Sequence, residues 1–223
     1  MENKQYPKIA GFLIFIGLTT GVLSIVPSVE SENYLGIVYQ NKTEVLIGAL
    51  FQFLLIPIYI GFTLIFYYLL RQYNSILLIG FIGFRFMAGV FQLLGIILLP
   101  VFILLSEKYS TEINSNLIYE TAGEILKFSR DLINHLGVII ATGLGNLLLY
   151  SILYKEKNIP IWLSLWGITG NVLIMIAGFL ILFQLIEVIS TEYIIIATPI
   201  LVQEIILAIW LIKNGLKHTK MSF

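Results

Sequence analysis

The sequence predicts an all-α integral membrane protein built from six transmembrane helices. Of its 223 residues, 58% are hydrophobic and only 12% are charged, whereas a soluble domain carries about 25% charged residues. Six apolar segments are long enough to cross about 30 Å of hydrocarbon, which takes about 20 helical residues. Helices are expected because a chain in lipid must satisfy its own backbone hydrogen bonds. We place them near residues 8–27, 44–70, 76–105, 119–153, 160–186 and 193–213.

The first segment follows Lys4 and Lys8, as the apolar part of a signal peptide would. Its apolar run exceeds the roughly 7–15 residues of a signal peptide, and "SIVPSVES" after it is a poor match to a small-x-small cleavage site. We therefore expect a retained helix. Gly17 and Gly21 within it form a Gly-x-x-x-Gly, a spacing that lets helices approach closely in lipid.

The remaining segments differ in length and in what interrupts them. Pro57 and Pro199 lie inside the second and sixth segments and predict kinks there. The third segment is longer than a membrane requires and is expected to tilt, or to bend near Pro100. The fourth begins with an outer amphipathic extension over residues 117–130.

The connections set the organisation of the bundle. Those between the second and third and between the fourth and fifth helices are very short, so each pair should be antiparallel neighbours. No connection is long enough to fold separately, and we expect one domain over residues 1–223.

Basic residues gather on one side of the predicted bundle. That side holds both termini and the two shortest connections, while the opposite loops are mainly acidic. Because Lys and Arg in short loops mark the cytoplasmic side, we expect a cell-membrane protein with both termini in the cytoplasm. The basic residues of this side are Lys4, Lys8, Arg71, Lys155, Lys157, Lys213, Lys217 and Lys220.

Several classes of function are disfavoured by composition. The 13 basic and 13 acidic residues give a net charge of zero, which offers no basic face to nucleic acid. The absence of cysteine excludes disulfides and thiolate metal sites. No phosphate-binding loop, dinucleotide fingerprint or nucleophile elbow is present. The sequence indicates no cofactor and no metal, and membrane lipids are the expected partners.

A permanent cation, Arg85, interrupts the third apolar segment. It lies nine residues from one end, which at 1.5 Å per residue is about 13 Å deep. Glu204 lies at the same depth in the sixth segment, nine residues from Lys213. Since a charge near the bilayer centre is costly unless paired or hydrated, we expect a buried Arg85–Glu204 ion pair. The pair is interpreted either as a structural clamp or as a functional site.

Two further sets of polar residues accompany this pair. Asn146 and Asn171 lie in the same half of the membrane and complete an expected polar layer, although each also suits ordinary interhelical hydrogen bonding. An outer polar stripe contains Glu124, Asp131 and His135 of the fourth helix, with Gln92 of the third. Asp131 and His135 are four residues apart and could touch, as in a metal site or a proton relay. A solvated outer helix end is the plainer interpretation.

Three strings carry a resemblance to a known family. "IGFIGFRFMAG" (79–89), "LLLYSILYKEKNIPIWLSLWGITG" (147–170) and "TPILVQEIILAIWLIKNG" (198–215) resemble an uncharacterised family of bacterial polytopic membrane proteins, domain of unknown function 4386. The resemblance extends over nearly the whole chain. It implies a multi-pass membrane protein and supplies no activity.

These observations lead to three functional hypotheses. The first is a membrane protein with a polar cavity around Arg85 and Glu204 that binds, senses or moves a small anionic or amphiphilic ligand, such as a lipid. The second is a structural or partner-binding protein in which the pair only fixes helix packing. The third, an intramembrane enzyme using Glu124, Asp131 and His135, is the least favoured because the stripe contains one histidine and no catalytic motif.

Overall fold

The computed structural model describes residues 5–112, 116–188 and 190–217, which leaves Lys4 and Lys220 outside the described residues. Six helices in it are long and apolar enough to span a membrane, as the sequence predicts. Two short helices lie between the first two spans. The helices are α1 (Gln5–Leu23), α2 (Pro27–Glu30), α3 (Tyr34–Ile37), α4 (Lys42–Leu70), α5 (Ser75–Thr111), α6 (Asn116–Asp131), η3 (Leu132–Val138), α7 (Ile139–Lys155), α8 (Ile161–Leu182) and α9 (Thr191–Lys213).

Side-chain and backbone caps fix several helix ends. The Asn74 side chain accepts a hydrogen bond from the Leu77 amide at the start of α5, and the Ser190 hydroxyl does the same for Tyr193 in α9. The fifth predicted helix, expected to reach residue 186, ends at Leu182. Gln184 has a φ of 56°, a left-handed conformation that turns the chain.

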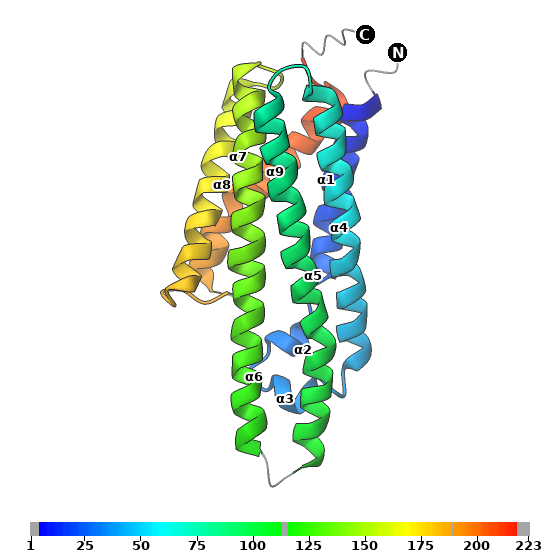
Figure 1. Cartoon of the computed structure of the whole chain (residues 1–223), viewed down its shortest axis with the longest axis vertical. Coiled ribbons are helices and arrows are strands. Elements are labelled where there is room, and N and C mark those ends of the chain that lie inside the picture. The colour runs from blue at the N-terminus through cyan, green and yellow to red at the C-terminus, as the bar shows by residue number, and fades with distance from the viewer. Residues whose placement is uncertain (1–4, 113–115, 189, 218–223) are drawn as a thin grey trace.

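The spanning helices form a closed ring. In order, α1 packs against α4, α4 against α5, α5 against α7, α7 against α8, α8 against α9, and α9 returns to α1. The expected neighbours α4 and α5, and α7 and α8, are therefore confirmed. In Figure 1, α1 begins and α9 ends at one end of the bundle, which we call the terminal end; α2 and α3 lie toward the other, the distal end.

The long helices continue beyond the ring at the distal end. The 37 residues of α5 correspond to about 55 Å, well over the thickness of a bilayer, and α5 and α6 extend past the ends of α8 and α9 (Figure 1). There α2 and α3 pack with α4, α5 and α6 around a second apolar cluster, which we call the distal cap. Its buried residues include Val29, Leu35, Val45, Leu99 and Phe102.

The fourth span is one rod with a π-helical segment inside it. The sequence predicts an uninterrupted helix over residues 119–153, whereas η3 separates α6 from α7. The structure packs α8 closely on this segment: a Cβ added to Gly178 would lie 2.7 Å from the backbone oxygen of His135. A π-helical stretch inside an α-helix often marks a functional position.

Glycines let α1 approach its neighbours. A Cβ on Gly17 would lie 3.3 Å from the ring of Tyr59 in α4, as close packing predicts, but a Cβ on Gly21 would meet no atom of the described residues within 4 Å. The Gly-x-x-x-Gly interpretation therefore fits Gly17 and not Gly21. The closest approach involves Gly11, which the spacing did not indicate.

Substitution of Gly11 by Ala is expected to lower the free energy of unfolding by about 2 kcal/mol. The added Cβ would lie 2.7 Å from the backbone oxygen of Ala208, so α1 must move away from α9. Thermal denaturation of the purified protein in detergent measures the effect. Gly21→Ala is the matched control on the same helix and should not lower stability, because its added methyl meets no described atom within 4 Å and alanine favours a helix more than glycine does. Equal losses in the two variants would contradict the close contact of α1 with α9.

Candidate functional site

Arg85 of α5 is buried inside the ring, with 8% of its surface exposed. Its Nε donates a 3.3 Å hydrogen bond to Oγ1 of Thr63 in α4. Its guanidinium carbon lies 5.0 Å and 5.5 Å from the ring centres of Tyr59 and Phe62, within the range of cation–π attraction. Gly145 of α7 leaves room for the stem, because a Cβ there would lie 3.4 Å from Cγ of Arg85.

The expected ion pair between Arg85 and Glu204 is not formed. Across the described ranges, the ion pairs within 4.0 Å are Lys108–Glu112 and Arg130–Glu30. Arg85 and Glu204 instead line one internal cavity of about 20 Å³, together with Asn146 and Tyr150. Matching depth placed the two charges at one level, as expected, but the guanidinium turns toward Thr63 and the rings of α4 rather than toward α9.

Arg85 also lines a second cavity, of about 30 Å³, between α4, α5 and the η3–α7 rod. Gln92 and Thr142 contribute its polar surface. A cavity needs about 10–15 Å³ on this measure to hold one water molecule. Each cavity in this conformation therefore has room for one or two waters, and Arg85 lies between them.

The polar layer forms two hydrogen-bonded pairs. Asn146 donates from Nδ2 to Oδ1 of Asn171 at 3.0 Å, and Asn171 donates to the backbone oxygen of Gly167 at 2.7 Å. Tyr150, which the sequence reasoning missed, donates from its hydroxyl to Oε1 of Gln203 at 2.8 Å. The spacing of Asn146 and Tyr150, four residues apart on one helical face, is the signal that would have found Tyr150.

The outer polar stripe is divided among different surroundings. Gln92 lines the second cavity, while Asp131 lines an open groove of about 660 Å³ beside the α8–α9 connection. His135 does not bond Asp131; its Nδ1 lies 3.3 Å from the hydroxyl of Tyr193. Glu124 is exposed on α6. In the described part of the chain, no three His, Asp or Glu side chains are grouped as metal ligands.

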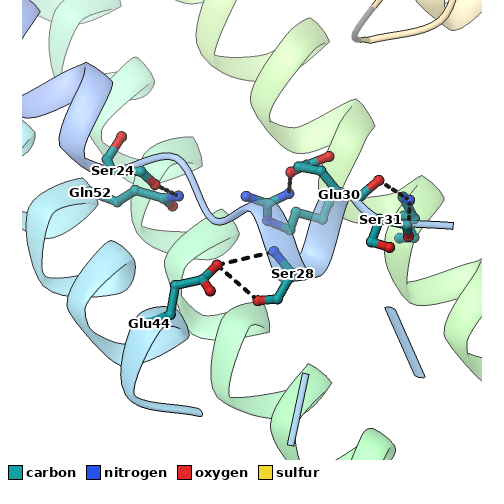
Figure 2. Close-up of polar contacts among 8 residues, drawn as sticks. Ser24, Ser28, Glu30, Ser31, Glu44 and Gln52 are labelled. Carbon is teal, nitrogen blue, oxygen red and sulfur yellow. Dashed lines mark hydrogen bonds and ion pairs between the residues drawn. The ribbon is translucent and has the colours of Figure 1, made fainter. Parts of the chain in front are cut away.

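A buried ion pair does exist, in the distal cap. Nη1 of Arg130 lies 2.7 Å from Oε1 of Glu30, with 6% and 18% of the two side chains exposed. Lys127 donates to the backbone oxygens of Glu30 and Ser31. Figure 2 shows these contacts holding the α1–α4 connection against α6.

The same connection is tied to α4. The carboxylate of Glu44 accepts hydrogen bonds from the backbone amide and the hydroxyl of Ser28, at 3.0 Å and 3.1 Å (Figure 2). Gln52 donates from Nε2 to the backbone oxygen of Ser24 at 3.0 Å. The α1–α4 connection is therefore bonded to α4 and to α6, through residues that no spacing in the sequence grouped together.

Tyr34 and Glu112, which both lie outside the spanning helices, have shifted pKa values. Burial raises the pKa of the Tyr34 hydroxyl, and the nearby carboxylates of Glu124 and Glu120 raise it further. The hydrogen bonds from Tyr119 and Lys108 lower the pKa of Glu112. Tyr34 therefore stays neutral at physiological pH, and its ring faces the Lys127 ammonium at 5.1 Å.

Comparison with known proteins identifies the family of this chain. No curated protein and no solved structure matches this sequence. The profile of a family described as Domain of unknown function (DUF4386) matches residues 9–215. This range includes Arg85, Glu204 and the greater part of each of the six spans. The resemblance noted in the sequence is thereby confirmed: this chain belongs to the DUF4386 family of membrane proteins.

Proposed function

We propose that this multi-pass protein binds the anionic group of a small or amphiphilic ligand at Arg85. The observation that supports this is a buried guanidinium that lines two cavities and has no carboxylate within 4.0 Å among the described residues. An arginine near the centre of a membrane costs about 2.5–3.5 kcal/mol on insertion scales. A bound anion would reduce that cost, which gives the site its selectivity for negative charge.

Glu204 gives the site a countercharge across the cavity. Without ligand, its carboxylate offsets the charge of Arg85 from the opposite wall. A carboxyl group can also take up a proton, whereas a guanidinium in a protein remains charged. The site can therefore accept an anion together with a proton, with Asn146 and Tyr150 as uncharged hydrogen-bonding groups beside it.

The size of the cavity restricts what enters it in this conformation. About 20 Å³ accommodates one water, or one oxygen of a larger anionic group. Tyr59 lines both cavities and has 38% of its surface exposed at the side of the bundle. An amphiphile that entered beside Tyr59 could keep its tail in lipid while its anionic group contacts Arg85.

Thermal stability of the purified protein with octanoate tests the proposal. Octanoate should raise the melting temperature in a concentration-dependent way, since a ligand at 100 times its Kd adds about 2.7 kcal/mol. Octanol is the matched control without a charge, and Arg85→Gln should abolish the octanoate effect. An equal shift with octanol, or an octanoate effect retained in Arg85→Gln, would show that the tail alone or another site is responsible.

A structural role is the second candidate, and cavity size favours it. A single water can bridge Arg85 and Glu204 across about 20 Å³ and fix the packing of α5 and α9 without any ligand. No anion would then change the stability of the protein. The enzyme hypothesis has less support, because the structure distributes Glu124, Asp131 and His135 over separate surroundings.

We also propose that the terminal end faces the cytoplasm of a cell membrane. The connections at that end carry Arg71, Lys155 and Lys157, and α9 ends at Lys213, the asymmetry that the positive-inside rule relates to the cytoplasmic side. Protease protection of an epitope fused to the C-terminus, measured in intact cells, tests this orientation.

A further inference from the structure

We propose that Arg85 is reached by water from the distal end only, along a path between α4, α5 and the η3–α7 rod. The inference concerns access to the ligand site at Arg85, and it rests on the proposed function. Its test uses no ligand, so the two can fail separately. The path is inferred from a cavity, from buried unpaired acceptors beyond it, and from the packing on the opposite side of Arg85.

The cavity of about 30 Å³ forms the inner part of the path. It is lined by Ile56 of α4, by Gln92 of α5 and by Val138 and Thr142 of the rod, with Arg85 at its inner end. Its volume accommodates about two water molecules. The side chains of Gln92, Thr142 and Arg85 supply the two to four polar partners that a buried water requires.

Buried acceptors continue the polar surface one turn further toward the distal end. Oε1 of Gln52 and Oδ1 of Asn134 are buried and accept no hydrogen bond from any described residue. Gln52 precedes Ile56 by four residues, and Asn134 precedes Val138 by four, so each lies one helical turn beyond the cavity. Asn134 reaches α5 at Gly95, three residues from Gln92, where a Cβ would overlap its amide.

Unpaired acceptors in such positions point to water. A buried carbonyl without a donor costs about 1–3 kcal/mol, and native proteins normally satisfy such groups with protein or ordered water. Two of them, from different helices, lie one helical turn beyond residues that line the cavity, on its distal side. Hydration of this column satisfies both and links them to Gln92, Thr142 and Arg85.

We place the distal mouth of the path at an open groove. The groove of about 660 Å³ beside the α8–α9 connection is lined by Lys127, Asp131, Gln184 and Glu187. Oδ1 of Asp131 is also buried without a hydrogen-bond donor among the described residues. Asp131 stands one residue before η3, and His135, four residues further along the chain, contacts Tyr193.

Apolar packing closes the terminal side of Arg85. Phe81, four residues toward the terminal end of α5, is fully buried, as are Phe66 of α4 and Leu153 of α7. They belong to one continuous apolar core at that end of the ring. These large side chains fill the interior of the ring on that side, and the Tyr150–Gln203 hydrogen bond there is already satisfied within the protein, so we infer that access is restricted to the distal side.

Single cysteines can test the path directly, because the chain has none of its own. Thr142→Cys and Gln92→Cys place a thiol in the inner cavity, and Ser164→Cys places one in a fully buried position near the terminal end. Membranes of defined orientation are treated with Ag⁺, an ion close to water in size, added on one side. The protein is then denatured, and the remaining free thiol is labelled with a maleimide carrying polyethylene glycol.

Sidedness is assigned by two exposed markers, Gln40→Cys at the distal end and Glu156→Cys at the terminal end. We expect Ag⁺ on the distal side to abolish later labelling of Thr142→Cys and Gln92→Cys, and Ag⁺ on the terminal side to leave it intact. Ser164→Cys should stay labelled in both cases.

Three outcomes would overturn the inference: full labelling of the cavity thiols after distal Ag⁺, protection from the terminal side, or protection of Ser164→Cys together with them. Thr142→Cys changes the side chain least and decides the result if Gln92→Cys does not fold. Loss of the octanoate effect with the thiol pattern intact would reject the proposed ligand site alone. An octanoate effect that is present together with a failed thiol pattern would reject only the proposed water path.

Discussion

Substitution of Glu204 by Gln is expected to lower the free energy of unfolding by about 3 kcal/mol, and by more than Arg85→Gln does. In Glu204→Gln, the permanent charge of Arg85 is left without the carboxylate that shares its cavity. In Arg85→Gln, the remaining carboxyl can be neutralised by a proton, which makes its burial far less costly. Equilibrium unfolding in mixed micelles measures both variants.

The double variant Arg85→Gln/Glu204→Gln is the control for this prediction. It removes both charges while keeping the volume and hydrogen-bonding capacity of the side chains, and it should be more stable than Glu204→Gln alone. Recovery of stability would show that the charges are coupled across the cavity, although they form no direct ion pair in the structure. A double variant as unstable as Glu204→Gln would mean that Glu204 does not compensate Arg85.

The six spans could be predicted because hydropathy and length are properties of single segments. A lipid-facing helix needs about 20 apolar residues wherever it lies in the fold, and all six were found. The predicted neighbours also followed from local information, since very short connections bring α4 beside α5 and α7 beside α8. Errors at helix ends were larger where polar residues continue a helix beyond the membrane, as at the end of α5.

The candidate site was predicted less completely. Counting residues from a helix end gives depth, and residues of matching depth, Arg85, Glu204 and Asn146, line one cavity. It does not give the direction in which a long side chain points. Arg85 has alternative partners in Thr63 and the aromatic rings of Tyr59 and Phe62, and nothing in the sequence of α5 distinguishes these from Glu204.

The distal cap was missed for a related reason. Glu30 and Arg130 are 100 residues apart. They lie in the short helix α2 and in the amphipathic helix α6, where charged side chains suit solvent equally well. Their pairing depends on how α2, α3 and α6 assemble, and no hydrophobic periodicity or residue spacing in the sequence predicts it. The cap nevertheless contains the shortest ion pair among the described residues. This pair is a buried electrostatic contact outside the ring of spanning helices, separate from Arg85 and Glu204.

Breaking the pair in the cap, by Arg130→Met, is expected to lower the free energy of unfolding by about 3 kcal/mol. Methionine retains part of the buried apolar stem of Arg130 but carries no charge. The carboxylate of Glu30, whose side chain is only 18% exposed, is then left without its cation. The connection between α1 and α4 should then separate from α6 before the ring unfolds, because Lys127 is left to hold it through two backbone oxygens and the ring of Tyr34. Equilibrium unfolding gives the energy, and limited proteolysis within residues 24–41 reports the detachment.

Lys108→Met is the matched control at the same end of the molecule. It removes the cation of the Lys108–Glu112 pair, whose side chains are 50% and 43% exposed, and exposed pairs of this kind contribute little because water screens both charges. We therefore expect no measurable change in stability and no new cleavage. If both variants behaved alike, burial would not distinguish the two pairs, and the cap would be held by its apolar cluster of Val29, Leu35 and Phe102 rather than by Arg130.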